Sequence, residues 1–547
     1  MELADGIACR REMRYKERAL TTNGRGTVSQ REQTQPAAKQ EELIEITEEL
    51  RAAQEQALGE ERRWQQMMEA SREEGKYNFR DYDQSQVHFV PVKLSTFLEA
   101  EHPARIIDLV VERMDLGGLY ECYSEEGNPP YHPRMMVKVL FYAYYKGLMS
   151  CRQVWDALQF RADFIFLSAG QVPNFRTVNA FRLRHLEQLP QLFAQIVFLC
   201  VRLGMVGFEH LSVDGQKIQA NASFRRSKNL KGLRKEYGKV RQAMQRLVEK
   251  PVDEQNFTAE VQQRRLERLQ TKARQLEGFQ KKLEALGDEE KRLNMSDEDA
   301  PVMRHKNRRI VPSYNHQSAV DVKYGVVCAV QSTRNGDQPK DLLPLVDAAK
   351  ENTGEQHEKV LADSGFCDYE TLQKVEEQRS EDFYLPDQRF EASKDQDNEP
   401  AKYPPDRFQP EEDGGLRCPE GHPMKQQRTV SYEDGHQVHI YEGTACEGCP
   451  SHDRCARGKK RTVHVDSRES FRDTMREKLS SDAGREAYMK RQGASEPVHG
   501  DDQKNKGWTQ HHLRGLAKAR GEFLLIRIAT NIAKIIKYRS PEILALA

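Results

Sequence analysis

Residues 210–215 read His-Leu-Ser-Val-Asp-Gly, a short apolar run that ends in an aspartate followed by a glycine. This pattern predicts a buried strand that stops at a turn, with Asp214 at its end. Residues 359–365, Lys-Val-Leu-Ala-Asp-Ser-Gly, repeat the pattern and predict a second strand that ends at Asp363. A third carboxylate, Glu496, lies in a basic stretch near the C-terminus, for which we expect a helix.

Carboxylates at the ends of neighbouring strands, joined by one from a helix, supply the oxygen ligands that Mg²⁺ prefers. Two such ions can activate a water or hydroxyl and stabilise the leaving oxygen of a phosphodiester. By itself, Asp214 would more often be a turn or cap residue than a metal ligand. The hypothesis of a two-metal site therefore depends on the combination of the three acids.

The composition limits the class of protein. A chain of 547 residues predicts three or four domains. Basic and acidic side chains number 85 each, so a nucleic-acid-binding surface requires local segregation of charge. Residues 485–539 show it, with 12 basic and 5 acidic side chains. No apolar stretch approaches the roughly 20 residues of a membrane span, and the scattered cysteines favour a reducing, cytoplasmic setting.

The first two segments of the chain differ in composition and in the periodicity of their apolar residues. Residues 1–85 are rich in charged and amide side chains, and they predict a solvated helix or short coiled coil that is partly disordered. A dimerisation role is the alternative. Residues 86–206 show amphipathic helical periodicity and predict a compact helical domain. That domain is either a structural or dimerising module or one that binds DNA ends.

From residue 207 the pattern becomes typical of strands, which predicts an α+β or α/β multidomain protein. Residues 207–386 and 484–540 are expected to build one core. Within them we expect adjacent strands or a hairpin at 315–321 and 322–331, helices at 342–350 and 523–536, and a short strand at 383–385.

Two insertions are expected to interrupt this core. Residues 224–311 are highly charged and have leucines at heptad spacing, which predicts a helical hairpin or coiled coil. Residues 387–483 are polar, and we expect them to be rich in loops.

The second insertion contains a cluster of cysteines with a C-x₂-C pair: Cys418, Cys446, Cys449 and Cys455. Four thiolates with one tight pair suit a closed tetrahedral zinc site, which can order a small polar segment without a core of its own. The spacing is less regular than in a paired C-x₂-C motif, so free thiols are the alternative. His422 or His452 is a candidate to replace one of the cysteines.

Several segments follow one another in a set order: residues 129–133, 175–178, 213–223, 312–321, 362–366, 496–498, 513–516 and 522–534. As an ordered set they resemble the DDE transposases of bacterial insertion sequences, in the group with an InsH-type N-terminal domain. The first two segments are similar to that domain, and the others are similar to the motifs around the catalytic acids. The resemblance covers about residue 88 to residue 540 and leaves the N-terminal extension outside.

The resemblance implies a ribonuclease H-like catalytic core in which Asp214, Asp363 and Glu496 hold two Mg²⁺ or Mn²⁺ ions. It implies double-stranded DNA as the partner, both as element ends and as target, and a homodimer in the DNA complex. The implied activity is metal-dependent cleavage at terminal inverted repeats followed by strand transfer, at the bacterial nucleoid in the cytoplasm.

Side chains around Glu496 are candidates for DNA contacts. The resemblance places Tyr488 and Arg491 where they can contact a phosphate or a flipped base near the cut. The alternative is an ordinary tyrosine and arginine on the surface of a basic helix. Further candidates for contacts with DNA are Lys504, Lys506 and Arg514.

Two residues depart from the pattern of the family. Relatives usually carry an aromatic residue where this chain has His499, and a lysine where it has Gln503. Lys504 is adjacent, but a helix turns about 100° per residue, so it does not simply replace that lysine. These departures motivate a second hypothesis, a catalytically impaired or domesticated copy that binds DNA without transposition. A two-metal nuclease unrelated to transposition is a third hypothesis, and it leaves the InsH-type half unexplained.

Overall fold

The computed structural model describes residues 98–545 with short gaps. The gaps are residues 125, 250–257, 289–290, 337, 388–389, 391–402, 404–406, 412–414 and 457. The charged extension expected for residues 1–85 lies outside the described residues. All described residues belong to the larger of the chain's two compact units, residues 71–547.

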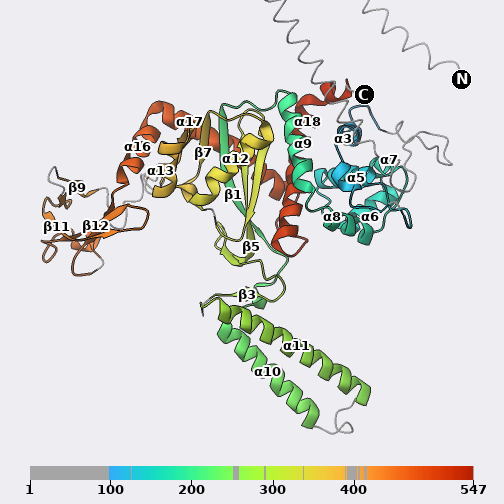
Figure 1. Cartoon of the computed structure of the whole chain (residues 1–547), viewed down its shortest axis with the longest axis horizontal. Coiled ribbons are helices and arrows are strands. Elements are labelled where there is room, and N and C mark those ends of the chain that lie inside the picture. The colour runs from blue at the N-terminus through green and yellow to red at the C-terminus, as the bar shows by residue number, and fades with distance from the viewer. Residues whose placement is uncertain are drawn as a thin grey trace, which may run out of the picture. The chain divides into compact units, whose positions relative to one another are not determined.

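The N-terminal part of the described chain is helical, as its periodicity predicted (Figure 1). Pro103 and Pro133 open helices, because the fixed φ of proline suits the first turn and its missing N–H is not needed there. Asn174 caps another helix by accepting a hydrogen bond from the N–H of Arg176 at 2.9 Å. The helices are α3 (Pro103–Glu112), α4 (Gly117–Tyr120), α5 (Pro133–Tyr145), α6 (Cys151–Phe160), α7 (Ala162–Leu167), α8 (Phe175–Arg184) and α9 (Leu189–Arg202).

A mixed sheet follows the helices. Its strands are β1 (His210–Gln219), β4 (Val302–Arg304), β5 (Ile310–Asp321), β6 (Val327–Thr333), β7 (Lys359–Ala362) and β8 (Asp382–Tyr384). They lie in the order β4-β5-β1-β7-β8, and β6 also pairs with β5. β1 is antiparallel to β5 and parallel to β7. The expected hairpin is confirmed as β5 and β6, although residues 322–326 form its connection and not part of a strand.

The prediction that the first strand stops at Asp214 is wrong. β1 continues to Gln219, and the residues after Asp214 keep their pairing with β5, from Gly215 opposite Gln317 to Gln219 opposite Ser313. The aspartate–glycine pair is typical of a turn, and the residues after it are mostly polar, so no apolar run marks this half as a strand. In the structure these residues alternate between buried and partly exposed positions, as in a strand. The parallel pairing with β7 does end at Val213, so Asp214 is the first residue of β1 beyond that neighbour.

Helices from several parts of the chain pack on this sheet. α17 (Asp482–Lys504) contacts β1, β5 and β7, whereas α12 (Leu342–Thr353) and α18 (Leu516–Leu544) contact β5 and β6. α18 also contacts α3, α5 and α9, and this double packing explains why residues 523–532 are all buried. The helices expected at 342–350 and 523–536 are thus confirmed. Among the helices of the described residues, none combines the length and apolarity needed to cross a membrane.

Two antiparallel helices, α10 (Leu230–Glu249) and α11 (Ala259–Ala285), occupy the segment where leucine spacing predicted a helical hairpin (Figure 1). Leu233, Val240 and Leu276 are buried in the seam between them. A short ribbon of β2 (Ser227–Lys228) and β3 (Leu293–Asn294) joins the two ends of the hairpin, with Ser227 opposite Asn294. We call residues 224–295 the arm.

The prediction of a loop-rich segment at residues 387–483 is wrong for much of its described part. An antiparallel sheet lies there, with strands β9 (Gln409–Pro410), β10 (Leu416–Arg417), β11 (Pro423–Ser431), β12 (Gln437–Gly443) and β13 (Thr462–Asp466). Most side chains of β11 are exposed, so the apolar alternation that marks a strand is nearly absent. A short helix, α15 (His452–Cys455), lies between β12 and β13, and a longer one, α16 (Glu469–Ser480), follows the sheet in the chain.

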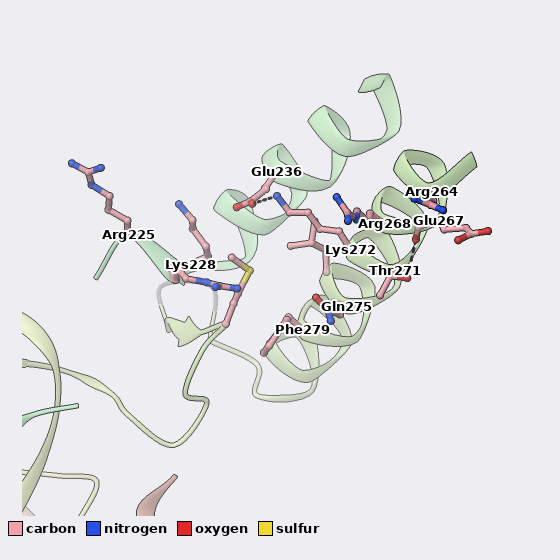
Figure 2. Close-up of a pocket in the computed structure, with 13 residues that line it drawn as sticks. Arg225, Lys228, Glu236, Arg264, Glu267, Arg268, Thr271, Lys272, Gln275 and Phe279 are labelled. Atoms are coloured by element: carbon pink, nitrogen blue, oxygen red, sulfur yellow. Dashed lines mark hydrogen bonds and ion pairs between the residues drawn. The ribbon is translucent and has the colours of Figure 1, made fainter. Parts of the chain in front are cut away.

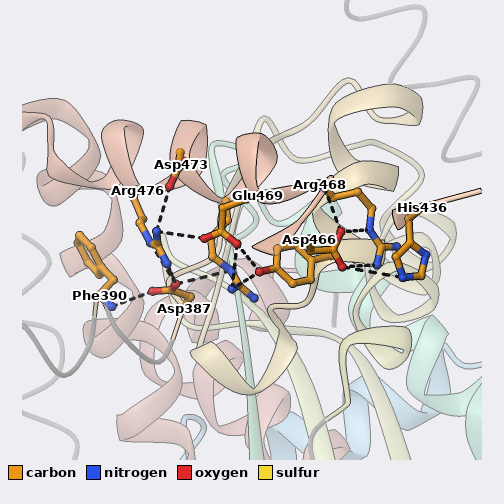
Figure 3. Close-up of polar contacts among 10 residues, drawn as sticks. Asp387, Phe390, His436, Asp466, Arg468, Glu469, Asp473 and Arg476 are labelled. Carbon is orange, nitrogen blue, oxygen red and sulfur yellow. Dashed lines mark hydrogen bonds and ion pairs between the residues drawn. The ribbon is translucent and has the colours of Figure 1, made fainter. Parts of the chain in front are cut away.

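Charged side chains attach α16 to residues that follow strands β7 and β8 of the mixed sheet (Figure 3). Arg476 donates to Asp387, just after β8, from Nε at 3.1 Å. Arg472 lies 3.9 Å from the ring centre of Tyr369 and donates to its hydroxyl at 2.6 Å. Burial alone would raise the pKa of Asp387, but hydrogen bonds from Arg476 and from the N–H of Phe390, with the charges of Arg476 and Arg472, together lower that pKa. The carboxylate is therefore charged, and these polar contacts add to the apolar packing of Met475 and Leu479 of α16 in the main core.

A buried glutamate holds the start of α18 against β5. Glu522 lies next to His511, with 3.0 Å between Oε2 and Nδ1, and it also accepts from the N–H of His512 at 3.1 Å. His511 in turn is 2.8 Å from His316 of β5, ring nitrogen to ring nitrogen. Burial raises the pKa of Glu522, but the two histidines together lower it more, so the pKa of this carboxyl lies well below its ordinary value.

We expect Glu522→Gln to lower the free energy of unfolding by about 2–3 kcal/mol at pH 7, because a charged acceptor is lost from a buried site. A depressed carboxylate pKa stabilises the fold above the ordinary value of 4.5. The difference between wild type and variant should therefore shrink as the pH falls below about 4.5. Urea unfolding at pH 7 and pH 4 measures both quantities. A difference that grows toward pH 4 would contradict the assignment.

Candidate active site

The register of β1 and β7 brings the two predicted aspartates together. Val213 lies opposite Ala362 in the parallel ladder, so Asp214 and Asp363 are the next residues of neighbouring strands. Asp214 is buried, and its Oδ1 accepts from the N–H of Gly215 at 2.8 Å. Asp363 is half-buried, and its Oδ1 accepts from the N–H of Gly365 at 3.0 Å.

The third predicted acid is placed differently. Glu496 lies on α17, which packs across β1 and β7, but its side chain is exposed. Ser495, one residue earlier, is the one that is buried against β1, with 2.6 Å between its hydroxyl and that of Ser212. Among the described residues, no group of three or more His, Cys, Asp or Glu side chains is arranged to hold a metal ion.

The face of α17 that meets Asp214 carries Arg491, Ser495, His499 and Asp502, at the spacing of one helical stripe. Arg491 Nη1 lies 3.9 Å and His499 Nε2 lies 3.8 Å from Asp214 Oδ2. Both distances are too long for hydrogen bonds. This stripe is the signal by which the sequence could have revealed that His499 faces the first aspartate.

His499 is neutral in this setting. Burial, followed by the charge of Arg527, lowers its pKa to about 3. Neither ring nitrogen has a hydrogen-bond partner among the described residues. A neutral imidazole therefore lies beside Asp214.

An ion pair beneath the site was not predicted. Asp502 is fully buried on α17, and it pairs with the equally buried Arg527 of α18. Its Oδ2 also accepts from Nε2 of Gln216, on the half of β1 that was expected to be a turn, at 2.9 Å. These contacts fix α17 to both β1 and α18.

The predicted DNA-contact residues fall into two groups. Lys504 and Arg514 are exposed, and Arg514 donates to the carbonyl of Asn221 at 2.9 Å. Tyr488 is buried, with the guanidinium carbon of Arg491 5.5 Å from its ring centre. The ammonium group of Lys506 is also buried, 2.8 Å from Asp501 Oδ2 and 2.9 Å from the hydroxyl of Thr530. Its position favours a structural role, whereas Lys504 and Arg514 face solvent.

The four clustered cysteines line one small cavity of the antiparallel sheet, together with His422 and His452. All four are free thiols, and backbone N–H groups point at two of them: His422 N lies 3.3 Å from Cys418 Sγ and Arg461 N 3.5 Å from Cys446 Sγ. Burial and then the nearby thiols raise the pKa of Cys455. The fold thus gathers four sulfurs that are up to 37 residues apart in the sequence.

Two models of known protein families match parts of the chain. Residues 417–536 match the family model described as Transposase DDE domain, and residues 92–184 match the one described as Transposase domain (DUF772). Together the two matches indicate a DDE-type transposase of the kind found in insertion sequences. The matched ranges contain Glu496 and the four cysteines, whereas Asp214 and Asp363 lie outside them. No curated protein and no solved structure matches the chain.

Replacing Asp502 should expose the role of the buried ion pair. We expect Asp502→Asn to lower the free energy of unfolding by about 3–5 kcal/mol, because Arg527 would stay buried without its counter-charge. The exposed neighbour Gln503 is the control, and Gln503→Ala should change stability by less than about 0.5 kcal/mol. Urea unfolding followed by circular dichroism measures the two variants, and equal midpoints would refute the argument.

Proposed function

We propose that this transposase cleaves DNA at the terminal inverted repeats of its element and joins the freed ends to target DNA, with Asp214, Asp363 and Glu496 as the catalytic acids. One observation carries the proposal: the parallel ladder of β1 and β7, which ends immediately before both aspartates. The family matches support the reaction class. The mixed sheet, with β5 antiparallel and β7 and β8 parallel to β1, supports a ribonuclease H-like core.

Divalent cations are the cofactor that this family implies, and the donors suit them in part. The two aspartates offer only oxygen ligands, which Mg²⁺ or Mn²⁺ prefers. The third acid is on the helix that crosses both strands, although its side chain is exposed. When bound, two such ions would supply an activated water and charge stabilisation for the leaving oxygen.

The chain's own residues then have separate tasks. Asp214 and Asp363 would hold the cations at the point where β1 leaves β7. Arg491, only partly exposed beside Asp214, is placed to bind the phosphate that is cut. His499, neutral and poor in hydrogen bonds, limits the entry of water next to Asp214. Lys504 and Arg514 are exposed and suited to contacts with the flanking backbone.

Two further parts of the proposal come from the class of protein. A transposase that joins two element ends is expected to act as a homodimer on double-stranded DNA. Its substrate is the bacterial chromosome, so we propose that it acts at the nucleoid in the cytoplasm.

We also propose that Cys418, Cys446, Cys449 and Cys455 bind one structural Zn²⁺. They line a single cavity, and the two N–H···S contacts are of the kind that orient thiolate ligands. The apolar cluster of this sheet is small, with Phe408, Leu416, Met424, Tyr441 and Val463 as its buried members. A metal would therefore supply stability that so small a core lacks.

The catalytic proposal is tested on DNA that carries the flanking repeats, with Mg²⁺ or Mn²⁺ added. We expect Asp214→Asn and Asp363→Asn to reduce cleavage by more than about a hundredfold, because even the loss of groups that only support a metal ligand costs 10–100-fold. Glu496→Gln should behave in the same way. Glu486→Gln, an exposed glutamate on the same helix, is the matched control and should cleave normally.

The outcome also separates an enzyme from an impaired copy. If the wild-type protein and Asp214→Asn give equally little product while both still shift the DNA, the catalytic proposal fails. The chain would then be a DNA-binding copy with the acids but without their activity.

The zinc proposal predicts about one zinc per chain by elemental analysis, lost in Cys446→Ser and Cys449→Ser. Both variants should also lower the thermal midpoint, because metal binding and folding of such a segment are coupled. Cys122→Ser, an exposed cysteine of the helical domain, is the control and should retain the metal. Wild-type protein purified without a chelator and containing no zinc would remove the site.

A further inference from the structure

The arm is a module with its own small core. The buried side chains of α10 and α11 face each other, and Tyr237 donates to Oε1 of Glu277 across the seam at 2.5 Å. At the far end of the hairpin, Gln262 donates to the carbonyl of Leu247 at 2.7 Å. At its base, Asn294 donates to the carbonyl of Ser223 at 2.8 Å. The helix pair is therefore held along its whole length without the basic side chains described next.

The arm is strongly basic in a chain that is neutral overall. Residues 224–295 contain 19 Lys and Arg against 11 Asp and Glu. The whole protein has 85 of each sign, so the arm carries a local excess that the rest of the chain balances. Such segregation gives a field that attracts polyanions.

Part of this charge gathers in one groove between the base of the arm and α11 (Figure 2). Its basic lining residues are Arg225, Arg226, Lys228, Arg264, Arg268 and Lys272. Only two acidic residues line it, Glu236 and Glu267. Lys272 is paired with Glu236 at 2.9 Å, and Figure 2 shows this contact on the inner side of the groove.

The other five basic side chains of the groove have no ion-pair partner among the described residues. Apart from the pair of Lys272 and Glu236, ion pairs of the arm lie outside the groove, such as Arg234 with Glu284 at 3.1 Å and Lys282 with Glu298 at 2.6 Å. Arg264 and Arg268 are exposed and four residues apart on α11, an arrangement of like charges that destabilises a helix by about 0.2–0.5 kcal/mol. The ion pairs that hold the arm together thus do not include these five charges, which points to an external anion.

We propose that this groove binds the phosphate backbone of double-stranded DNA, in contacts that do not read the base sequence. The inference rests on the proposed function, because it assumes that DNA is the partner of the chain. Arginine offers a planar fork that matches two phosphate oxygens, and such contacts fix the position of a protein on a duplex. Arg264 to Lys272 spans about 12 Å along α11, which is several phosphate spacings and too long for one small anion.

The arm is connected directly to the sheet that carries Asp214. β1 ends at Gln219, and the arm begins five residues later, so the strand that carries Asp214 leads directly into it. On the return path, β4 and β5 follow the arm, and β5 pairs with β1. A duplex held by the groove is thus tethered at both ends of the arm to the sheet that holds the two aspartates.

The test compares two full-length variants that lose the same charge from the same helix. Arg264→Gln with Arg268→Gln removes two arginines of the groove. Arg274→Gln with Lys281→Gln removes two exposed basic residues of α11 that do not line it. Affinity for a duplex that carries an element end is measured by fluorescence anisotropy in EDTA, across a series of salt concentrations.

We expect the groove variant to bind about tenfold more weakly or worse, and the slope of log affinity against log salt to fall by about 2, as for two lost phosphate contacts. The control variant should keep the wild-type affinity within about twofold, and a scrambled duplex should show the same loss as the element end. Equal affinities and slopes for the two variants would overturn the proposal. So would a larger loss on duplex RNA than on duplex DNA of the same length, which would assign the groove to RNA.

Binding in EDTA does not depend on cleavage, so the two proposals fail separately. A wild-type protein that shows the groove-dependent affinity but never cuts DNA contradicts only the catalytic proposal. A groove variant that binds as the control does, while the wild type cleaves, contradicts only the arm proposal.

Discussion

The parallel pairing of β1 with β7 is the constraint on which the rest of the site depends. The ladder covers only residues 210–213 and 359–362, and it ends immediately before both aspartates. A shift of one residue in this register would turn the side chains of one strand to the other face of the sheet. Antiparallel pairing of β1 with β5, which runs over nine residue pairs, makes such a shift costly because every one of those pairs would change. The longer ladder thus holds the shorter one in register.

The helix that carries the third acid is positioned by buried polar contacts instead of by a strand ladder. Ser495 meets Ser212, and Asp502 meets both Gln216 and Arg527. Such contacts are directional, and an unpaired charge in this place would be strongly unfavourable. They therefore select one rotation of α17 over others. In that rotation Arg491 and His499 face Asp214, and Glu496 lies about 100° away on the helix.

Local sequence patterns predicted the parts of the fold whose side chains are mainly apolar. The runs before Asp214 and Asp363, the hairpin of β5 and β6, and the apolar α18 all gave clear signals. The second half of β1 did not, because Gln216, Lys217 and Gln219 are polar strand residues that the ladder with β5 accommodates. The small antiparallel sheet was not predicted for the same reason: most side chains of β11 are exposed, so its sequence lacks the apolar alternation of a strand.

The site was predictable in its residue types but not in its contacts. Motif order alone named Asp214, Asp363 and Glu496, but which face of α17 meets the sheet is decided by tertiary contacts. His499 was noticed as a departure from relatives, and only the structure places it 3.8 Å from Asp214. Asp502 and Arg527 gave no signal, because a charged residue in sequence is normally a surface residue. Their burial becomes visible only when α17 and α18 are placed against each other.

Two insertions, the arm and the small sheet, separate the three acids in the sequence without separating the elements that carry them. The arm separates Asp214 from Asp363, and the small sheet separates Asp363 from Glu496. The free-energy cost of closing a loop rises only slowly with the length of the loop, so a long insertion is tolerated when its two ends are held close together. The ribbon of β2 and β3 holds the ends of the arm, and the contacts of Arg476 and Arg472 with Asp387 and Tyr369 hold the small sheet to the residues after β7. Each module therefore leaves the sheet and returns to it without altering the register of β1 and β7.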